Sequence, residues 1–394
     1  MTHQFGVRDI LEVYFTLLPE GELPAFHPNG DGEVSASDAG ALADWWADVL
    51  TDETDRGLER SFDYYRALFH LGKKPGLALS YNDPASVIYP HVVEVIASCF
   101  SDRSREQVLE SAGVSDVNAL PGRMRTDSAV RNAFRHAFET DVRESSLAGP
   151  MLSFLYSLVY LTGFSSGGEV SFVTRIFPEV AGWSGHILDA GGGSGFAGLV
   201  LATRGPVTYV DFSPLRAGRA RALAHRIHND ADFLAQVLDL IDLEASAFGL
   251  EMDRSLVPPL AGSKDGELIC RSADLSRPPD DMGPFDGAII TDVLEHTTDP
   301  EAVVKNVSSL LKPGAKLLVT VPTDANGIAQ RVREEEQGYT FPFLLHIEFF
   351  SDERIERIAH AAGMTVQRIV PFSFAEMTCA AKVPMEAMAV LKKR

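Results

Sequence analysis

The spacing of apolar positions changes character about halfway along the chain. Up to about residue 177, apolar side chains recur at the spacing of amphipathic helices. Clusters of Gly, Pro, Asn and Asp, which favour turns, separate the helical stretches. The predicted helices cover residues 7–18, 42–50, 55–71, 85–100, 105–112, 129–143 and 151–161. The first half is therefore expected to be a mainly α-helical domain that ends near residue 182.

From residue 183 onward, short β-type runs alternate with helical ones. The predicted strands cover residues 186–188, 207–210, 268–270, 287–291 and 316–321. Each is a continuous apolar run rather than an alternation of apolar and polar positions. Such runs, separated by helices, indicate a parallel sheet covered on both faces. We therefore predict two domains, residues 1–182 and residues 183–394, with an α/β architecture in the second.

The charge balance narrows the classes of partner. The 394 residues include 35 Lys and Arg against 55 Asp and Glu, a formal net charge of −20. This excess argues against a nucleic-acid-binding surface, because neutralising phosphates requires clustered Lys and Arg. Cys99, Cys270 and Cys379 lie far apart, which disfavours a disulfide framework and a cysteine zinc site. No signal peptide or membrane-spanning run is recognisable, so the sequence predicts a cytoplasmic protein without a membrane partner.

A glycine-rich loop follows the first predicted strand, at residues 189–195, and opens a helix predicted at 196–202. Glycines there let the backbone turn tightly and approach a ligand beside a helix N-terminus. The carboxylate of Asp189 would repel a pyrophosphate but suits a cationic amino-acid moiety. Asp211, 22 residues further on, ends the next strand, where a carboxylate can bind ribose hydroxyls. The loop by itself is also compatible with a nicotinamide dinucleotide site or a structural turn.

Five motifs in one order carry a resemblance to a known family. They cover residues 189–195, 207–211, 272–275, 285–292 and 311–317. Over residues 184–384 the sequence resembles the class I S-adenosylmethionine-dependent methyltransferases. The stretches 292–296 and 346–351 are similar to the subgroup that includes ubiquinone-pathway O-methyltransferases. The resemblance implies a Rossmann-like domain with a seven-stranded, mostly parallel sheet, which ends in an antiparallel hairpin of residues 365–369 and 377–382.

The resemblance also implies S-adenosylmethionine as the cofactor and a set of residues that bind it. The glycine loop would hold the methionine part, the second strand end the ribose, and the third the adenine, while the fourth strand end forms the mouth of the site. The implied residues are Asp189, Ala190, Gly191, Gly193, Gly195, Asp211, Phe212, Asp274, Leu275 and Asp292. Asp211 and Asp274 are also compatible with simple turn residues at strand ends.

Two histidines are the catalytic candidates. His296 follows a strand end and could act as a general base, since neutral imidazole accepts a proton near pH 7. A structural role at the start of the following helix is the alternative. His346 stands among Phe and Leu residues, so packing competes with function there. Because no short ligand spacing joins these histidines to Glu295 or Glu348, we expect no metal site.

Together these features predict methyl transfer to the oxygen, nitrogen or acidic carbon of a small molecule, plausible in specialised metabolite biosynthesis. A protein or nucleic-acid methyltransferase and a non-catalytic cofactor-binding scaffold are the alternatives. Residues 229–264 form an insertion between the second and third strands, which we expect to cap the site or join the helical domain. By analogy with related enzymes, the helical domain is expected to form a homodimer and close over the substrate.

Overall fold

The structure is a computed structural model. It describes residues 100–120, 127–137, 166–212, 214–229, 231–247, 251–256, 268–297, 299–323, 348–372 and 386–394, with single positions at 40, 41, 44, 45, 48, 97, 123, 140 and 141. Outside the described residues lie the predicted helices at 7–18, 55–71 and 151–161, most of that at 85–100, and the predicted strand at 377–382. Within the described part of the chain, no helix combines the length and apolarity needed to cross a bilayer.

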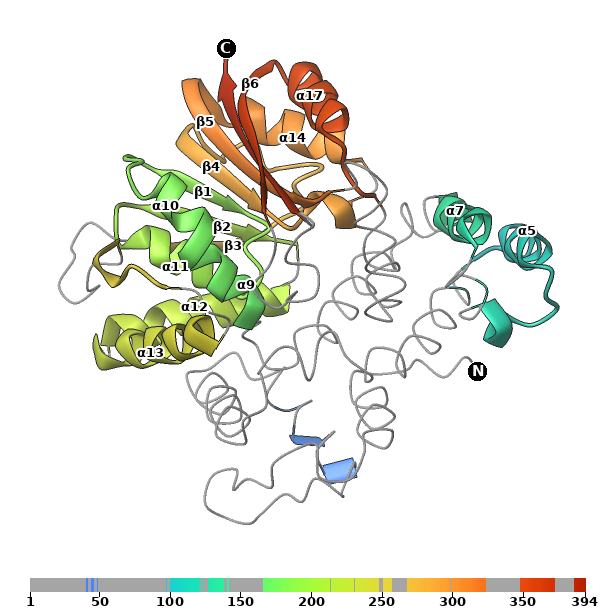
Figure 1. The fold of residues 1–394 in the computed structure, drawn as a ribbon, viewed down its shortest axis with the longest axis horizontal. Helices are drawn as coiled ribbons and strands as arrows, with labels where there is room; N and C mark the ends of the chain where they lie inside the picture. Colours follow the sequence, from blue (N-terminus) through green and yellow to red (C-terminus); the bar gives the residue numbers. More distant parts are fainter. Residues whose placement is uncertain are drawn as a thin grey trace.

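Seven strands form one sheet, in the order β3-β2-β1-β4-β5-β7-β6 (Figure 1). They are β1 (Ile187–Ala190), β2 (Val207–Asp211), β3 (Leu268–Ser272), β4 (Phe285–Thr291), β5 (Leu311–Pro322), β6 (Met364–Phe372) and β7 (Glu386–Lys393). The first five pair in parallel, whereas β7 runs antiparallel to both β5 and β6. This confirms the predicted seven-stranded, mostly parallel sheet. The strand order reverses beside β1, and ligands of open α/β sheets bind at the carboxyl ends of strands at such a point.

One strand of the predicted hairpin is confirmed. β6 covers the predicted strand at residues 365–369 and pairs with β7, while the predicted partner at residues 377–382 lies outside the described residues. Glu, Ala, Met, Leu and Lys dominate β7, and these residues favour helices in isolation. The neighbouring strands impose the extended conformation on β7. It lies between β5 and β6, pairs with both, and has residues 386–391 buried.

Helices cover both faces of the sheet, which explains the continuous apolar strands (Figure 1). One face carries α9 (Ser166–Ser171), η4 (Phe172–Ile176), α10 (Phe177–Val180), α11 (Phe196–Ala202), α12 (Pro214–Asn229) and α13 (Ala231–Ala247). The other carries α14 (Pro300–Ser309) and α17 (Asp352–Ala361). Neighbouring residues of β1 point to opposite faces of the sheet. Ile187 is buried in the apolar core under the first set of helices, and Leu188 in the core under the second.

The segment α9–η4–α10 is one nearly continuous helical stretch that packs on the sheet. A wide π-type turn at η4 interrupts it just before Pro178. Proline has no N–H to donate, so the regular pattern of helical hydrogen bonds cannot continue through that position. Phe172 and Phe177 of this stretch are buried in the same apolar core as Ile187. The proposed domain boundary at residue 183 therefore follows a helix that already packs against the second domain's sheet.

The described parts of the insertion are mainly α13 and residues 251–256, which include the short helix η5 (Arg254–Leu256). Val237, Leu238 and Ile241, three of the apolar positions that marked the insertion in the sequence, are buried in the core shared with α9. α13 contacts both α9 and α12. It thereby thickens the helical layer on this face and contacts a helix that precedes the sheet in the chain. The loop around residues 258–259 lies outside the described residues.

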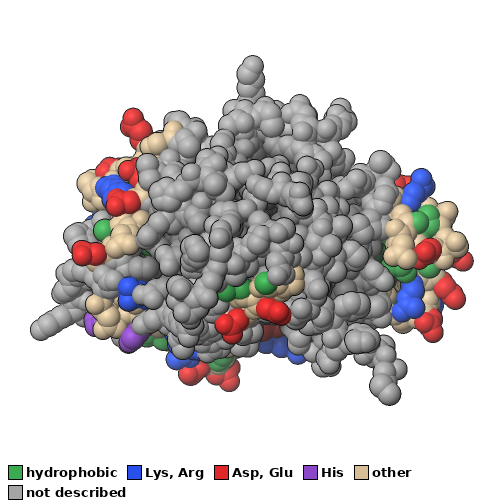
Figure 2. All heavy atoms as spheres, turned by 90° about the horizontal axis from the view of Figure 1, so that it is seen from below, with side chains coloured by type: hydrophobic (Ala, Val, Ile, Leu, Met, Phe, Trp, Pro, Cys, Tyr) green, Lys and Arg blue, Asp and Glu red, His purple; other side chains and the backbone are tan. Residues whose placement is uncertain are grey.

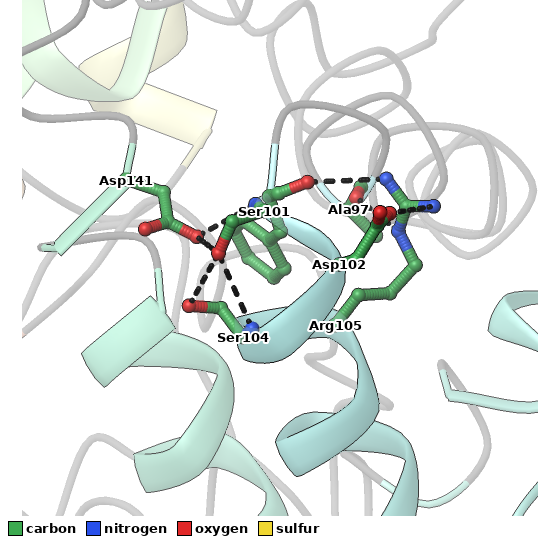
Figure 3. A network of polar contacts seen from close by, with 7 residues as sticks. Ala97, Ser101, Asp102, Ser104, Arg105 and Asp141 are labelled. Carbon is green, nitrogen blue, oxygen red and sulfur yellow. Dashed lines mark hydrogen bonds and ion pairs between the residues drawn. The ribbon is translucent and has the colours of Figure 1, made fainter.

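Two further helices, α5 (Asp102–Ala112) and α7 (Ser128–Ala137), pack against each other near η2 (Val117–Ala119). They confirm the helices predicted at 105–112 and 129–143. Ser101 caps α5: its hydroxyl accepts from the N–H of Ser104 at 3.3 Å and donates to Asp141 at 2.9 Å (Figure 3). Burial acts to raise the pKa of Asp141, but hydrogen bonds from Ser104 and Ser101 outweigh it and lower the pKa.

Candidate functional site

The loop between β1 and α11 requires glycine at defined positions. Gly191 has φ +80°, and a Cβ atom there would lie 2.5 Å from Cγ2 of Val293, just after β4. Gly195 has φ +83°, and its Cβ would lie 2.6 Å from Cβ of Ala220 in α12. L-residues with side chains rarely adopt this backbone region, and neither site has room for one. The glycines thus let the loop pack tightly between β4 and α12, immediately before the N-terminus of α11.

The carboxylate of Asp211, at the end of β2, is tied to this loop. Its Oδ2 accepts from the N–H of Gly193 at 3.2 Å and lies 3.8 Å from Nη1 of Arg216 in α12. The hydroxyl of Tyr209 donates to the carbonyl of Gly193 at 2.7 Å from below. Asp211 is 3% exposed. The acid and the loop, distant in sequence, therefore form one hydrogen-bonded unit.

Asp189 lies beneath the loop rather than at its surface. Its side chain is fully buried, and neither oxygen makes a well-formed hydrogen bond. Its Oδ2 occupies the space that a Cβ at Gly192 or Gly198 would need, at 2.5 Å and 2.8 Å. Burial raises the pKa of Asp189 to about 7; the N–H of Gly198 opposes the rise and the charge of Asp211 adds to it. Asp189 thus places ionisable charge directly under the loop.

The residues expected to contact adenine come together at the end of β3. Asp274 is exposed, and its two oxygens accept from the N–H and the hydroxyl of Ser276, both at 2.8 Å. This is the geometry of a turn, although each oxygen retains a second lone pair for a ligand. Leu275 is buried, and Phe212 is half-buried beside β3, where Ser272 donates to its carbonyl at 3.3 Å.

Asp292, the residue after β4, has a strained backbone. It has φ +53° and is the one residue other than glycine with positive φ among the described residues. Oδ1 of Asp292 accepts from the hydroxyl of Thr320 at 2.9 Å, and the N–H of Asp292 donates to the same hydroxyl at 3.1 Å. Thr320 is fully buried in β5. A strained residue held in this way by its surroundings is typical of functional sites.

His296 lies in the short helix η6 (Leu294–His296), three residues after Val293, which contacts the loop. Its side chain is 9% exposed, and Nε2 lies 3.6 Å from Oε1 of Glu295, which is almost fully buried. His346 lies outside the described residues. Where the structure describes the chain, no group of three His, Cys, Asp or Glu side chains could hold a metal ion.

The predicted site residues that the structure describes, all except His346, are therefore brought to one edge of the sheet, at the carboxyl ends of β1, β2, β3 and β4. Sequence reasoning missed several of their partners. These are Glu169, Tyr209, Arg216, Val293 and Thr320. Tyr209 and Thr320 stand in apolar strand runs and resembled core positions, while Glu169 precedes the sheet and matched no motif. The acidic side chains of the described residues do not gather into one patch in the view of Figure 2.

A parallel sheet with a topological switch point, a glycine loop opening a helix and an acid ending the second strand define a Rossmann-like protein that binds a nucleoside-containing ligand. Residues 170–369, about half of the chain, match a family model described as "Methyltransferase domain". The chain belongs to this family and is a class I S-adenosylmethionine-dependent methyltransferase. No curated protein matches the sequence.

Solved structures with a similar arrangement include magnesium protoporphyrin IX methyltransferase from Synechocystis PCC 6803 with bound SAH, at 17% identity and TM-score 0.39, covering 58% of this chain and 84% of that one. A SAM-dependent methyltransferase from Methanosarcina mazei has 18% identity and TM-score 0.38, covering 56% and 97%. The 1,6-didemethyltoxoflavin-N1-methyltransferase of Burkholderia thailandensis has 16% identity and TM-score 0.35, covering 57% and 78%. The family assignment rests on the family model and not on these superpositions.

The residues present fit S-adenosylmethionine, the cofactor of this class. The cofactor carries ribose hydroxyls, which suit the carboxylate of Asp211, and two cationic groups. The buried Asp189, which lacks a well-formed hydrogen bond, suits those cations electrostatically. The N–H groups of Gly191 and Gly192 donate to the carbonyl of Val210, at 2.7 Å and 3.2 Å, and these bonds hold the loop against the end of β2. When bound, the cofactor supplies an electrophilic methyl group on a sulfonium.

Proposed function

We propose that the enzyme methylates a small molecule at an oxygen, a nitrogen or an acidic carbon, in the biosynthesis of a specialised metabolite. The observation that carries this proposal is the position of the base candidate in the chain: Val293 lies against Gly191, and His296 follows three residues later. In this proposal the imidazole of His296 accepts a proton at the mouth of the site, where an acceptor would enter.

In this proposal the chain chiefly positions the reacting groups, because displacement at a methyl group requires in-line geometry. Asp211 and the glycine loop would hold the ribose and methionine ends. For a hydroxyl or acidic-carbon acceptor, the imidazole of His296 would take the proton. The carboxylate of Glu295, 3.6 Å from Nε2, would stabilise the imidazolium that results. An amine acceptor would need only to arrive unprotonated.

We further propose a subgroup of the family, an oligomeric state and a cellular location for this enzyme. The stretch Asp292-Val293-Leu294-Glu295-His296 supports membership of the subgroup of ubiquinone-pathway O-methyltransferases. We infer a cytoplasmic homodimer joined through the helical first domain, which would also cover the acceptor. Light scattering of the full chain and of a chain starting near residue 165 would test the dimer. Loss of dimerisation without that segment is the expected result.

The decisive experiment for the acceptor is a metabolite panel incubated with methyl-labelled S-adenosylmethionine and read by mass spectrometry. Labelled small molecules are the expected product. Labelling only of added protein or nucleic acid would favour the first alternative, a macromolecular methyltransferase. Cofactor binding without transfer to any acceptor class would favour a non-catalytic scaffold. The net charge of −20 supports the small-molecule proposal over nucleic acid.

A further inference from the structure

A buried carboxylate outside the family motifs touches the cofactor loop. Glu169 of α9 is 5% exposed, and its Oε1 accepts from the hydroxyl of Ser194 at 3.0 Å. Ser194 stands in the glycine loop, between Gly193 and Gly195. α9 precedes the sheet in the chain, so this bond connects the loop to an element other than the strand and helix that the loop joins.

Ser194 has a second role at the start of α11. Its Oγ accepts from the N–H of Phe196, the first residue of that helix, at 3.3 Å. The N-cap position itself is Gly195, which has no side chain to cap the free N–H groups. The hydroxyl hydrogen that points to Glu169 leaves the lone pairs of the oxygen for Phe196. Glu169 therefore orients the group that caps α11.

The position of Glu169 is itself well determined. Its neighbour Val170 is fully buried in the core, and Phe172 packs edge-on against Phe196, with ring centroids 6.4 Å apart. The segment α9–η4 is thus packed against the first turn of α11 through Phe172 of η4. Burying a carboxylate is costly unless it gains strong hydrogen bonds, so its retention next to a ligand-binding loop calls for a specific role.

We propose that Glu169 is a positioning residue for methyl transfer, which acts through Ser194 to hold the glycine loop in its cofactor-binding conformation. Gly193 and Gly195, on either side of Ser194, both have positive φ. Two such glycines give the loop many alternative conformations when no side chain restrains it. The Glu169–Ser194 bond selects one of them, in which the N–H of Gly193 reaches Asp211.

The test compares Ser194→Ala, Glu169→Ala and their double variant by calorimetry with S-adenosylmethionine. Each single variant should weaken binding about tenfold, as expected for loss of a hydrogen bond to a charged group. The double variant should bind no more weakly than Ser194→Ala, because Glu169 acts on the loop through Ser194 and has nothing left to orient once that hydroxyl is gone. Glu169→Gln should retain most of the affinity, since its amide oxygen can still accept from Ser194.

Glu179→Gln is the matched control. Glu179 lies in α10, on the same helical stretch, and pairs with Arg368 of β6 away from the loop. It should leave cofactor affinity unchanged, whatever its effect on thermal unfolding. Additive losses in the double variant, or unchanged affinity in Ser194→Ala, would overturn the proposal. Ser194 is half-buried in a loop, so its replacement by Ala provides a readout even where Glu169→Ala fails to fold.

Discussion

The N–H of Gly193 donates to Oδ2 of Asp211 across 3.2 Å, so the loop after β1 and the acid that ends β2 act as one structural unit. Arg216 faces the same carboxylate oxygen, and Tyr209 holds the carbonyl of Gly193 from the opposite side. The carboxylate is thereby oriented toward the loop. Changes at either end of the unit should affect the other.

Replacing Asp211 should weaken the cofactor site directly. Asp211→Ala removes both the acceptor for ribose hydroxyls and the restraint on Gly193, so S-adenosylmethionine affinity measured by calorimetry should fall about 10- to 100-fold. Asp281→Asn is a suitable control, because Asp281 is an exposed carboxylate that pairs with Arg271 beyond β3. Equal affinities for wild type and Asp211→Ala would refute this role.

His296→Ala separates catalysis from cofactor binding. If the imidazole takes the acceptor's proton, kcat with a hydroxyl or carbon acceptor should fall about 100- to 1000-fold. The dissociation constant for S-adenosylmethionine should stay near that of wild type, since the side chain lies beyond the loop. Stopped-flow turnover together with calorimetry provides both quantities. Undiminished turnover would leave His296 with a purely structural role.

Gly191→Ala should destabilise the fold at the centre of the site. A Cβ there meets Val293 at 2.5 Å and the backbone has φ +80°, so the cost in urea unfolding should be about 1–3 kcal/mol. Gly314→Ala is the matched control, because Gly314 has φ +78° and nothing within 4 Å of a Cβ. The difference between the two variants measures the contact with Val293. When it is combined with Gly191→Ala, Val293→Ala should remove the clash and so recover that difference in stability. The cost of the positive φ should remain.

The raised pKa of Asp189 should make the free energy of unfolding depend on pH. Its pKa in the folded protein, about 7, exceeds the ordinary value of 3.8, because the carboxyl is buried. The folded state therefore binds more protons than the unfolded state between these values, and the free energy of unfolding falls as the pH rises through them. The stabilisation that protonated Asp189 contributes is complete below its ordinary pKa of 3.8. It is lost as the pH rises through the pKa of about 7 in the folded protein.

Asp189→Asn removes this titration while it keeps the shape of the side chain. Urea unfolding should show the variant gaining stability relative to wild type as the pH rises from about pH 4 to about pH 7, by up to about 1.4 kcal/mol per pH unit. The comparison of wild type with variant cancels the titration of other acids. Parallel curves for the two proteins over this range would contradict the raised pKa.

Much of the second domain was predictable because its signals are local. The strands β1, β2, β4 and β5 each contain a predicted run that is mostly apolar, and helix α11 has the predicted bounds. The positions of Asp189 and Asp211 at strand ends also follow from the motif spacing. β7 was not predicted, since its residues favour a helix locally and only its two neighbouring strands impose an extended conformation.

The sequence by itself determined the class of fold, the parallel sheet and the strand ends at which polar residues gather, because hydrophobic periodicity and glycine positions are local properties. Tertiary structure alone decided which atoms meet. It placed Asp189 under the loop, Val293 against Gly191, and Glu169 on Ser194. These contacts join elements distant in the chain, and they depend on how helices pack on the sheet. No periodicity along one segment encodes that packing.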